Sequence, residues 1–406
     1  MSLPLYLYDD PADVPHFLPF TDVRPIGELR YGAWLLRERI ERAMGPVQGY
    51  LAGAHLAGFT EPGAPAVVAP PDTGTPRLFL RSTFVPGAQD FAIAIGATSG
   101  SAVTLVDEAG ATIGAALPAK VEWHGPGALG PTTPTLVLKG KRLEGVWELV
   151  GDLLPVLRAD LDDACRAAQR TRVPAGCTVL GDPALLVVDD TATVEPLVVF
   201  DTRSGPIWIQ AGAEVRTFSR LAGPLLVGAG TRVVGGQLRE SSIGPMCVVH
   251  GEVSNSLFLG YTNKSHDGFL GHSVIGRWVN LGAGTITSNL KNTYGSIRLN
   301  LGAARVETGM QFLGSLVGDH AKTAIGTMLP TGCVVGVGAN LFGTARPAAL
   351  VPAFAWGTDE PGGVVACRMF LQTASRVLPR RDVAFDEATR RWLTDVWQHC
   401  TGQACD

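Results

Sequence analysis

The chain of 406 residues is long enough for two or three domains, and its hydrophobic content of 46% indicates a folded protein rather than a disordered one. The formal net charge is −4 and lysines and arginines form no long run, which excludes the electrostatic footprint of a DNA- or RNA-binding protein. Fifty glycines and 28 prolines predict a fold rich in turns.

The sequence predicts a cytoplasmic protein without a membrane partner. Its first apolar stretch follows no basic segment and soon meets acids and prolines, which is not typical of a signal peptide. An apolar run of about 18 residues, as a transmembrane helix requires, does not occur. The seven cysteines are scattered without CxxC spacing and are expected to be reduced thiols.

Residues 1–170 are predicted to form an α/β domain. Residues 5–8 are expected to form a short strand, and residues 28–44 carry apolar side chains at helical spacing. A second helix is expected over residues 146–170, bent at Pro155. Further strands are expected at residues 91–95, 102–106 and 135–138.

The apolar period changes at Val173 and predicts a parallel β-helix of hexapeptide repeats over residues 171–350. Apolar residues recur there every six positions, with glycines at the expected corners, whereas a helix would need a period of about 3.6. The phase slips between blocks, so loops are expected at some corners. The series are Val173, Val179 and Leu185; Val227 and Val233; Ile243 and Val249; Phe269, Ile275 and Leu281; and Val317, Thr323, Leu329, Val335 and Leu341.

A polar segment, residues 287–300, interrupts the repeats and is expected to project as a loop, where binding groups often lie. Residues 351–406 are expected to form a linker and two helices, near residues 363–377 and 386–399. These helices would cap the solenoid or pack on a neighbouring subunit.

The stretch NKSHDGFLGHSVIGRWVNLGAGTITSN, residues 263–289, carries polar residues that the repeat does not need. His266 is either a general base, which takes a proton from an attacking amine, or a solvated loop histidine. Asn280 and Asn289 either donate hydrogen bonds to a carbonyl or oxyanion, or form a structural ladder. Each nearby lysine is either a phosphate ligand or a solvated side chain. These lysines are Lys264, Lys291 and Lys322.

A zinc site shared between subunits is a weaker alternative, because His266 and His272 are six apart and fall on adjacent faces of a solenoid. No metal ligand set is therefore assigned. In the N-terminal domain, a nucleotidyltransferase is expected to have a glycine-rich turn after the first strand. Asp9, Asp10 and Pro11 occupy those positions instead. The candidate nucleotide ligands are Arg24, Glu28 and Arg30, although Arg24 and Glu28 would equally suit a structural ion pair.

Four segments together, LPFTDVRPIGELRYG, NKSHDGFLGHSVIG, VNLGAGTITSNLKNTYG and GDHAKTAIGT, resemble the alternative bacterial family of GlmU-like sugar-nucleotide enzymes. That family is related to the bifunctional enzyme that acetylates glucosamine-1-phosphate and then uridylylates it to UDP-N-acetylglucosamine. The resemblance implies a nucleotidyltransferase-like α/β domain followed by a left-handed parallel β-helix. It also implies a homotrimer with acetyl-coenzyme A in clefts between subunits.

The resemblance places His266 at the catalytic base, Asn280 at the asparagine of the NIGAGT segment, and Asn289 at the asparagine that opens the protruding loop. Phe269 stands where the bifunctional enzyme has a tyrosine. The loop lysine and a preceding arginine of that enzyme are replaced near Gly295 and Val249. Lys264, Asn289, Lys291 and Phe269 are thus assigned to the sugar phosphate, and Ala283, His320 and Lys322 to coenzyme A.

These expectations define an acetyl-CoA-dependent N-acetyltransferase of cell-envelope sugar-nucleotide synthesis, acting on an amino-sugar phosphate similar to glucosamine-1-phosphate or on a nucleotide sugar. The alternative is a UTP-dependent sugar-1-phosphate nucleotidyltransferase that uses the β-helix for trimerisation, and only this activity would need Mg²⁺. A third hypothesis is a nucleotide-sugar sensor without turnover.

Overall fold

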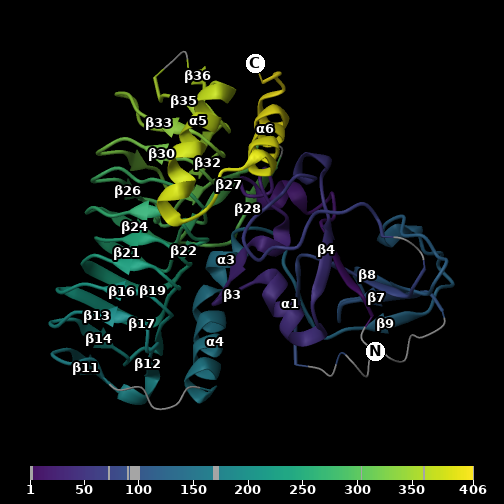
Figure 1. Cartoon of the computed structure of the whole chain (residues 1–406), viewed down its shortest axis with the longest axis horizontal. Coiled ribbons are helices and arrows are strands. Elements are labelled where there is room, and N and C mark those ends of the chain that lie inside the picture. Colours follow the sequence, from purple (N-terminus) through teal and green to yellow (C-terminus); the bar gives the residue numbers. More distant parts are fainter. Residues whose placement is uncertain are drawn as a thin grey trace.

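The computed structural model describes residues 3–71, 74–88, 91, 101–167, 173–302, 304–359 and 362–405. An N-terminal α/β domain lies beside a tall β-solenoid, and the C-terminal helices lie near one end of the solenoid (Figure 1). The predicted combination of an α/β domain, a parallel β-solenoid and C-terminal helices is confirmed.

The N-terminal domain is built on a six-stranded sheet in which β1 pairs in parallel with β4 and β5. Leu5 and Leu7 of β1 are buried, which explains why so short an apolar run forms a central strand. The strand order is β4 (Val47–Leu51), β1 (Leu5–Tyr8), β5 (Arg77–Arg81), β8 (Thr112–Leu117), β7 (Val103–Val106) and β9 (Thr135–Val137). The strand expected at residues 91–95 falls almost entirely outside the described residues.

Two helix predictions in this domain are corrected. Helix α1 (Leu36–Met44) begins later than expected, because the hairpin of β2 (Arg30–Tyr31) and β3 (Trp34–Leu35) precedes it. The expected helix at residues 146–170 is divided into α3 (Glu148–Gly151) and α4 (Leu153–Ala167). Pro155 lies in the first turn of α4, where a helix needs no amide donor, so it does not bend a continuous helix.

Short elements complete the domain. They are η1 (Val14–Phe17), η2 (Ile26–Glu28), η3 (Ala54–Leu56), η4 (Pro126–Ala128), and the paired strands β6 (Phe84–Pro86) and β10 (Gly140–Arg142).

The solenoid has three faces of stacked parallel strands around one apolar core. The first face consists of β11 (Thr178–Leu180), β14 (Val199–Asp201), the first halves of β17 (Ser219–Val227) and β19 (Gly236–Ile243), β21 (Glu252–Ser254), β24 (Phe269–Gly271), β26 (Ile286–Thr287) and β31 (Met328–Leu329).

The second face follows η5 (Pro183–Leu185) and consists of β12 (Leu186–Val188), β15 (Ile207–Ile209), the second halves of β17 and β19, β22 (Leu257–Phe258), β25 (Val274–Ile275), β29 (Leu316–Val317), β32 (Val334–Val335) and β34 (Leu350–Val351). The third face consists of β13 (Thr193–Val194), β16 (Glu214–Val215), β18 (Arg232–Val233), β20 (Val248–Val249), β23 (Asn263–Lys264), β30 (Lys322–Thr323), β33 (Asn340–Leu341), β35 (Ala355–Trp356) and the antiparallel β36 (Gly363–Val364). Strand pairing therefore continues beyond residue 350.

The six-residue spacing identifies most inward positions but is one residue out of phase at β24. Ile275 and Leu281 lie in the core as predicted, whereas Leu270 replaces Phe269, which is only partly buried. The inward residue six positions earlier is Lys264, in register with Val249 of the preceding turn. Because a lysine is not expected in an apolar core, the sequence does not show that position 264 points inward at this turn.

The second face packs against the N-terminal domain through a shared apolar cluster. Leu153 and Leu157 of α4 belong to one cluster with Leu226, Leu257 and Val274 of the solenoid. The Ser242 hydroxyl also donates a hydrogen bond of 2.7 Å to the main-chain oxygen of Gly32. The two domains therefore share a core and are not joined only by a linker.

Helices α5 (Cys367–Val377) and α6 (Glu387–Thr401) flank the short η6 (Leu378–Arg381) and pack beside the solenoid. Phe370 of α5 and Trp397 of α6 contact Phe354 at a solenoid corner. On the other side, Trp392 packs edge-on against Phe59 of the N-terminal domain. None of the helices in the described segments is long and apolar enough to cross a membrane.

The expectation that all seven cysteines are reduced is wrong for two of them. Cys367 at the start of α5 and Cys405 after α6 form a disulfide, which closes the helical segment on itself. Cys247 and Cys333 are buried in the solenoid core, where each acts as a small apolar side chain.

We expect the disulfide to stabilise the C-terminal helices by about 2–4 kcal/mol, because it restricts the unfolded chain between the two cysteines. A reductant should lower the urea midpoint of the wild-type protein but leave Cys405→Ala unaffected, since that variant has no bridge to lose. Cys165→Ala, which removes a free cysteine, is the matched control. An equal response of wild type and Cys405→Ala to the reductant would contradict this assignment.

Candidate functional site

The corner that holds His266 is fixed by a buried lysine. Lys264 is 2% exposed, and its ammonium donates hydrogen bonds of 2.8 Å to the main-chain oxygens of His250 and His266. Burial lowers the pKa of Lys264 to about 8. Lys264, which is predicted to bind the sugar phosphate, therefore directs its ammonium to the backbone of the His266 corner.

His266 itself is exposed at the corner between the third and first faces. No described residue forms a hydrogen bond with its imidazole, whereas the neighbouring Asp267 approaches His250 at 3.3 Å. Ala283 lies at the corner of the next turn, where the amide of Gly284 donates to the main-chain oxygen of Asp267 at 3.0 Å. The imidazole of His266 is thus free of hydrogen bonds to described residues, on a corner that Lys264 holds in place. The corner next to it carries Ala283, one of the predicted coenzyme A contacts.

Asn280 takes part in a polar column on the third face. It is bridged to Asn263 in the turn before and to Lys322 in the turn after. The side-chain amide of Asn263 donates 2.9 Å to Oδ1 of Asn280, so the asparagine ladder considered from the sequence is present. The amide nitrogen of Asn280 remains available to another acceptor. The Lys322 ammonium donates 3.0 Å to the main-chain oxygen of His320, and burial lowers its pKa to about 8.

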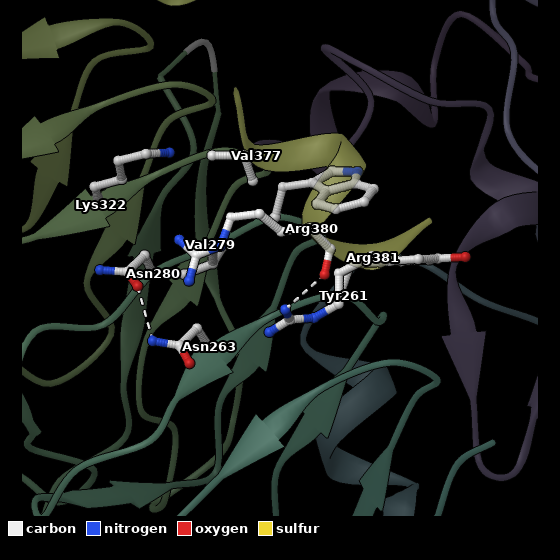
Figure 2. Close-up of a pocket in the computed structure, with 9 residues that line it drawn as sticks. Tyr261, Asn263, Val279, Asn280, Lys322, Val377, Arg380 and Arg381 are labelled. Atoms are coloured by element: carbon white, nitrogen blue, oxygen red, sulfur yellow. Dashed lines mark hydrogen bonds between the residues drawn. The ribbon is translucent and has the colours of Figure 1, made fainter. Parts of the chain in front are cut away.

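A cavity of about 240 Å³ lies over this column, and we call it the third-face pocket (Figure 2). Asn263, Asn280 and Lys322 line it from the third face. Arg380 and Arg381 line it from η6, on the opposite side in Figure 2. The two arginines were not predicted, because they lie far along the chain and only the return of the C-terminal helices brings them to the solenoid.

Asn289 lies at the other edge of the first face from His266. Its side-chain nitrogen is 2.9 Å from Nδ1 of His272, whose ring stacks on Phe312 at 5.2 Å. Burial lowers the pKa of His272 to about 4, so the neutral ring can accept the amide hydrogen bond near neutral pH. Phe269 lies close to the same corner, within contact range of Gly271. In one chain, Asn289 therefore lies across the first face from His266.

The polar segment after Asn289 is an inserted loop at this corner, as predicted, and it includes the hairpin of β27 (Arg298–Asn300) and β28 (Arg305–Glu307). Within it the Lys291 ammonium donates 2.5 Å to the main-chain oxygen of Ser296 and remains exposed in part.

His320, which is predicted to contact coenzyme A, lies among buried side chains. It is 4% exposed, its ring is stacked near Trp278 and it meets Phe370 edge-on. Burial lowers the pKa of its imidazole well below the ordinary value, so the ring is neutral in the folded protein. A histidine packed between the solenoid and α5 has no open face for a ligand.

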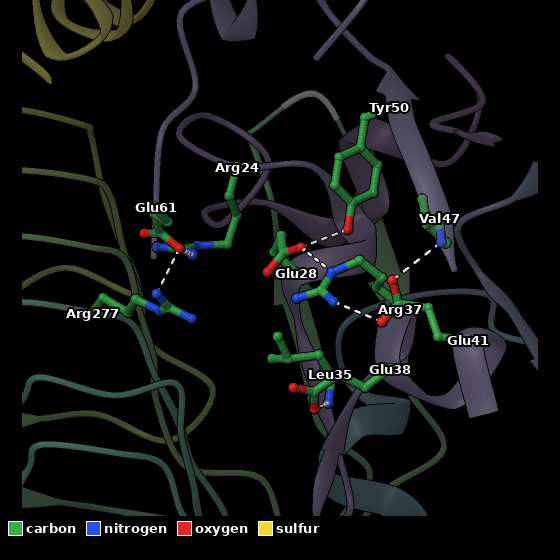
Figure 3. A network of polar contacts seen from close by, with 10 residues as sticks. All are labelled: Arg24, Glu28, Leu35, Arg37, Glu38, Glu41, Val47, Tyr50, Glu61 and Arg277. Carbon is green, nitrogen blue, oxygen red and sulfur yellow. Dashed lines mark hydrogen bonds and ion pairs between the residues drawn. The ribbon is translucent and has the colours of Figure 1, made fainter. Parts of the chain in front are cut away.

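The three predicted nucleotide ligands are buried in polar networks, and Figure 3 shows the networks of Arg24 and Glu28. Arg24 forms ion pairs with Glu61 and with Asp319 of the solenoid, and Arg277 joins Glu61 at 2.7 Å. Arg24 is therefore a link between the two domains.

Glu28 and Arg30 serve the interior of the N-terminal domain. Glu28 does not pair with Arg24; it accepts hydrogen bonds from Arg37 at 2.7 Å and from the Tyr50 hydroxyl at 2.6 Å. Arg30 donates 2.5 Å to the main-chain oxygen of Ala33.

The carboxyl ends of β1 and β5 are where an open α/β sheet binds ligands, and acids gather there. Asp13 is held by Arg81 at 2.6 Å and by the Thr83 hydroxyl at 3.0 Å. Asp9 is buried and accepts a hydrogen bond of 3.0 Å from the amide of Ile26. The carboxylate of Asp13 does not fit Mg²⁺ as arranged, since Arg81 and Thr83 occupy both of its oxygens. One oxygen of Asp9 is buried and has no hydrogen-bond partner among the described residues. Across the described segments no three His, Cys, Asp or Glu side chains converge as a metal site.

Burial raises the pKa of Asp9 from 3.8 to about 7. The folded protein then binds a proton that the unfolded chain has already lost at intermediate pH, so this group contributes stability that is lost as the pH rises from about 4 to about 7. We expect Asp9→Asn, which keeps an acceptor for Ile26, to gain stability relative to wild type across that window. Thermal unfolding at several pH values measures this difference, and a difference that stays constant with pH would contradict the assignment.

The described residues form an α/β domain followed by a parallel β-solenoid, with an exposed histidine at a solenoid corner. Residues 5–166 match the family model described as sugar nucleotidyl transferase. The segment that matches this family precedes the β-solenoid, and the chain is distantly homologous to the bifunctional GlmU proteins.

Two relatives illustrate the match. A bifunctional sugar-1-phosphate nucleotidylyltransferase/acetyltransferase of Sulfurisphaera tokodaii is 31% identical over 91 residues, which are 22% of this chain and 23% of the relative. The bifunctional protein GlmU of a Cyanothece strain is 28% identical over 233 residues, or 46% of this chain and 51% of the relative. The chain thus spans between about a quarter and a half of the curated relatives it matches.

Among solved structures, a Bacillus cereus protein described as a putative acetyltransferase is 11% identical, with a TM-score of 0.25 over 53% of this chain and 100% of that chain. The UDP-N-acetylglucosamine acyltransferase of Francisella novicida is 12% identical, with a TM-score of 0.24 over 50% of this chain and 75% of that chain.

Proposed function

We propose that the protein is an acetyl-CoA-dependent N-acetyltransferase that acts on an amino-sugar phosphate or a nucleotide sugar. The observation that carries this proposal is the exposed imidazole of His266, on a corner fixed by the buried Lys264. Such an imidazole is free to take a proton from an attacking amine. The homology with bifunctional nucleotidylyltransferase/acetyltransferases supports acetyl-CoA as the donor.

In the proposed reaction, the acceptor amine attacks the thioester carbonyl of acetyl-CoA while His266 removes a proton from the nitrogen. Collapse of the tetrahedral intermediate breaks the carbon–sulfur bond and releases coenzyme A as the thiol, which takes up the proton. We assign the oxyanion of this intermediate to the side-chain amide of Asn280, whose nitrogen forms no hydrogen bond with a described residue. No covalent intermediate on the protein is required.

Completion of the site is assigned to neighbouring copies in a homotrimer. Asn289 and Lys291 lie across the first face from His266, so a second copy is needed to bring such groups to the imidazole. Apolar side chains are exposed along the edge that carries His266: Phe218 is 75% exposed, Ile325 80% and Met328 50%. Exposed apolar residues that follow one edge are typical of a protein interface. Light scattering of the full chain tests this arrangement, and a monomer at micromolar concentration would contradict it.

The activity is tested by coenzyme A release, measured with a thiol reagent. We expect release with acetyl-CoA and glucosamine-1-phosphate, and none with N-acetylglucosamine-1-phosphate, which matches the acceptor but lacks a free amine. Equal rates with the two sugars would show thioester hydrolysis instead of N-acetylation. Absence of release with any amino-sugar phosphate or amino nucleotide sugar would overturn the proposal.

The second candidate is a UTP-dependent sugar-1-phosphate nucleotidyltransferase, and the family match over residues 5–166 favours it. Its test is Mg²⁺-dependent release of pyrophosphate from UTP and a sugar 1-phosphate. The engaged carboxylate of Asp13 weighs against it, because this activity needs open ligands for the metal.

A further inference from the structure

The third-face pocket combines groups from two parts of the chain that the sequence separates widely. One wall is the solenoid, which contributes Asn280 and Lys322, and the opposite wall is η6, which contributes Arg380 and Arg381. The cavity of about 240 Å³ has room for a phosphate and part of a sugar ring.

The pocket is positively charged, and no acid is among the described residues that line it. Arg381 donates only to main-chain oxygens, to Met246 at 3.0 Å and to Arg380 at 3.1 Å. Burial lowers the pKa of Arg381, and the nearby charges of Arg232 and Arg380 lower it further. Arg380 has no ion pair with a described residue. This contrasts with Arg24 and Arg277, whose charges are balanced by buried carboxylates.

The remaining wall is apolar and aromatic. Tyr261 and Trp278 stack with their ring centres 4.4 Å apart, and both line the pocket. The amide nitrogen of Asn280, which forms no hydrogen bond with a described residue, lies beside Lys322 on the solenoid wall. Cations beside an aromatic surface and an amide donor suit a ligand that joins a phosphoryl group to a ring.

We propose that the third-face pocket binds the phosphoryl group of a phosphorylated ligand, with Arg380 as the main ligand and Lys322 as a second charge. Arginine presents a planar fork that matches phosphate oxygens, and lysine adds a compact charge. That the ligand is the amino-sugar phosphate acceptor rests on the proposed function. Coenzyme A carries phosphoryl groups of the same chemistry, and the test separates the two sources.

The test is calorimetric binding to the full-length protein of inorganic phosphate, glucosamine-1-phosphate, glucosamine and coenzyme A. We expect glucosamine-1-phosphate to bind at least about tenfold more tightly than glucosamine. Arg380→Gln should weaken its binding by about 10- to 100-fold, the loss of a hydrogen bond between charged groups. Arg376→Gln is the matched control, because Arg376 is an exposed arginine about one turn earlier that does not line the pocket. Thermal unfolding of both variants checks that they fold.

Weakened coenzyme A binding in Arg380→Gln, with unchanged sugar-phosphate binding, would support the phosphoryl site and assign it to the donor. Equal affinities of wild type and Arg380→Gln for all the phosphorylated ligands would overturn it, as would equal affinities of wild type for glucosamine and its phosphate. These measurements need no turnover. If the protein binds phosphate through Arg380 but transfers no acetyl group, the phosphoryl site is supported and the proposed function is contradicted.

Discussion

Replacement of Arg24 by methionine is expected to lower the free energy of unfolding by about 3–5 kcal/mol, because it leaves Asp319 and Glu61 as charges without their main partner in the interior. All three side chains are at most 5% exposed, so water does not replace the lost guanidinium. The urea midpoint and its slope measure the effect.

The control is Arg216→Met, which breaks an exposed ion pair with Glu214. It should cost at most about 1 kcal/mol, as exposed pairs do. Equal effects of the two substitutions would contradict the role of Arg24 as a buried link between domains. A loss of pyrophosphate release in Arg24→Ala would accordingly report a disturbed fold before it reported a lost nucleotide contact.

We expect His266→Ala to lower kcat for acetyl transfer by about 10²- to 10⁴-fold, which is the usual contribution of a general base. Because the imidazole of His266 is exposed and forms no hydrogen bond with a described residue, the thermal midpoint of the variant should change little. His124→Ala, at an exposed histidine of the N-terminal domain, is the matched control.

Undiminished activity in His266→Ala would sink the assignment of the base. Partial recovery of the variant's rate by added imidazole would support it, because a free base can then occupy the space left by the side chain.

The β-solenoid was predictable because its rhythm is carried by residues that lie close together in the sequence. Ile275 and Leu281 follow the six-residue spacing and are in the core. Lys264 was missed because a lysine does not look like a core residue, although it falls in register with Val249 of the preceding turn. That register was the available signal, and it would have placed the ammonium inside the corner instead of in a phosphate site.

The burial of Arg24 and of His320 was not predictable, for a different physical reason. The partners of Arg24 and His320 come from distant parts of the chain: Arg24 meets Asp319 across 295 positions, and Phe370 of α5 packs on His320. A local motif does not reveal such partners, so a buried arginine and a buried histidine were taken for ligands. The C-terminal helices also fold back on the solenoid to create the third-face pocket. No short segment of the sequence predicts this pocket.

The most direct test of the central claim is mass analysis of the sugar product after incubation of the wild-type protein with glucosamine-1-phosphate, acetyl-CoA and UTP in the presence of Mg²⁺. The proposed function predicts an N-acetylated sugar phosphate, formed together with free coenzyme A and without any need for UTP. Formation of a UDP-sugar with the amine still free, and with acetyl-CoA intact, would contradict it.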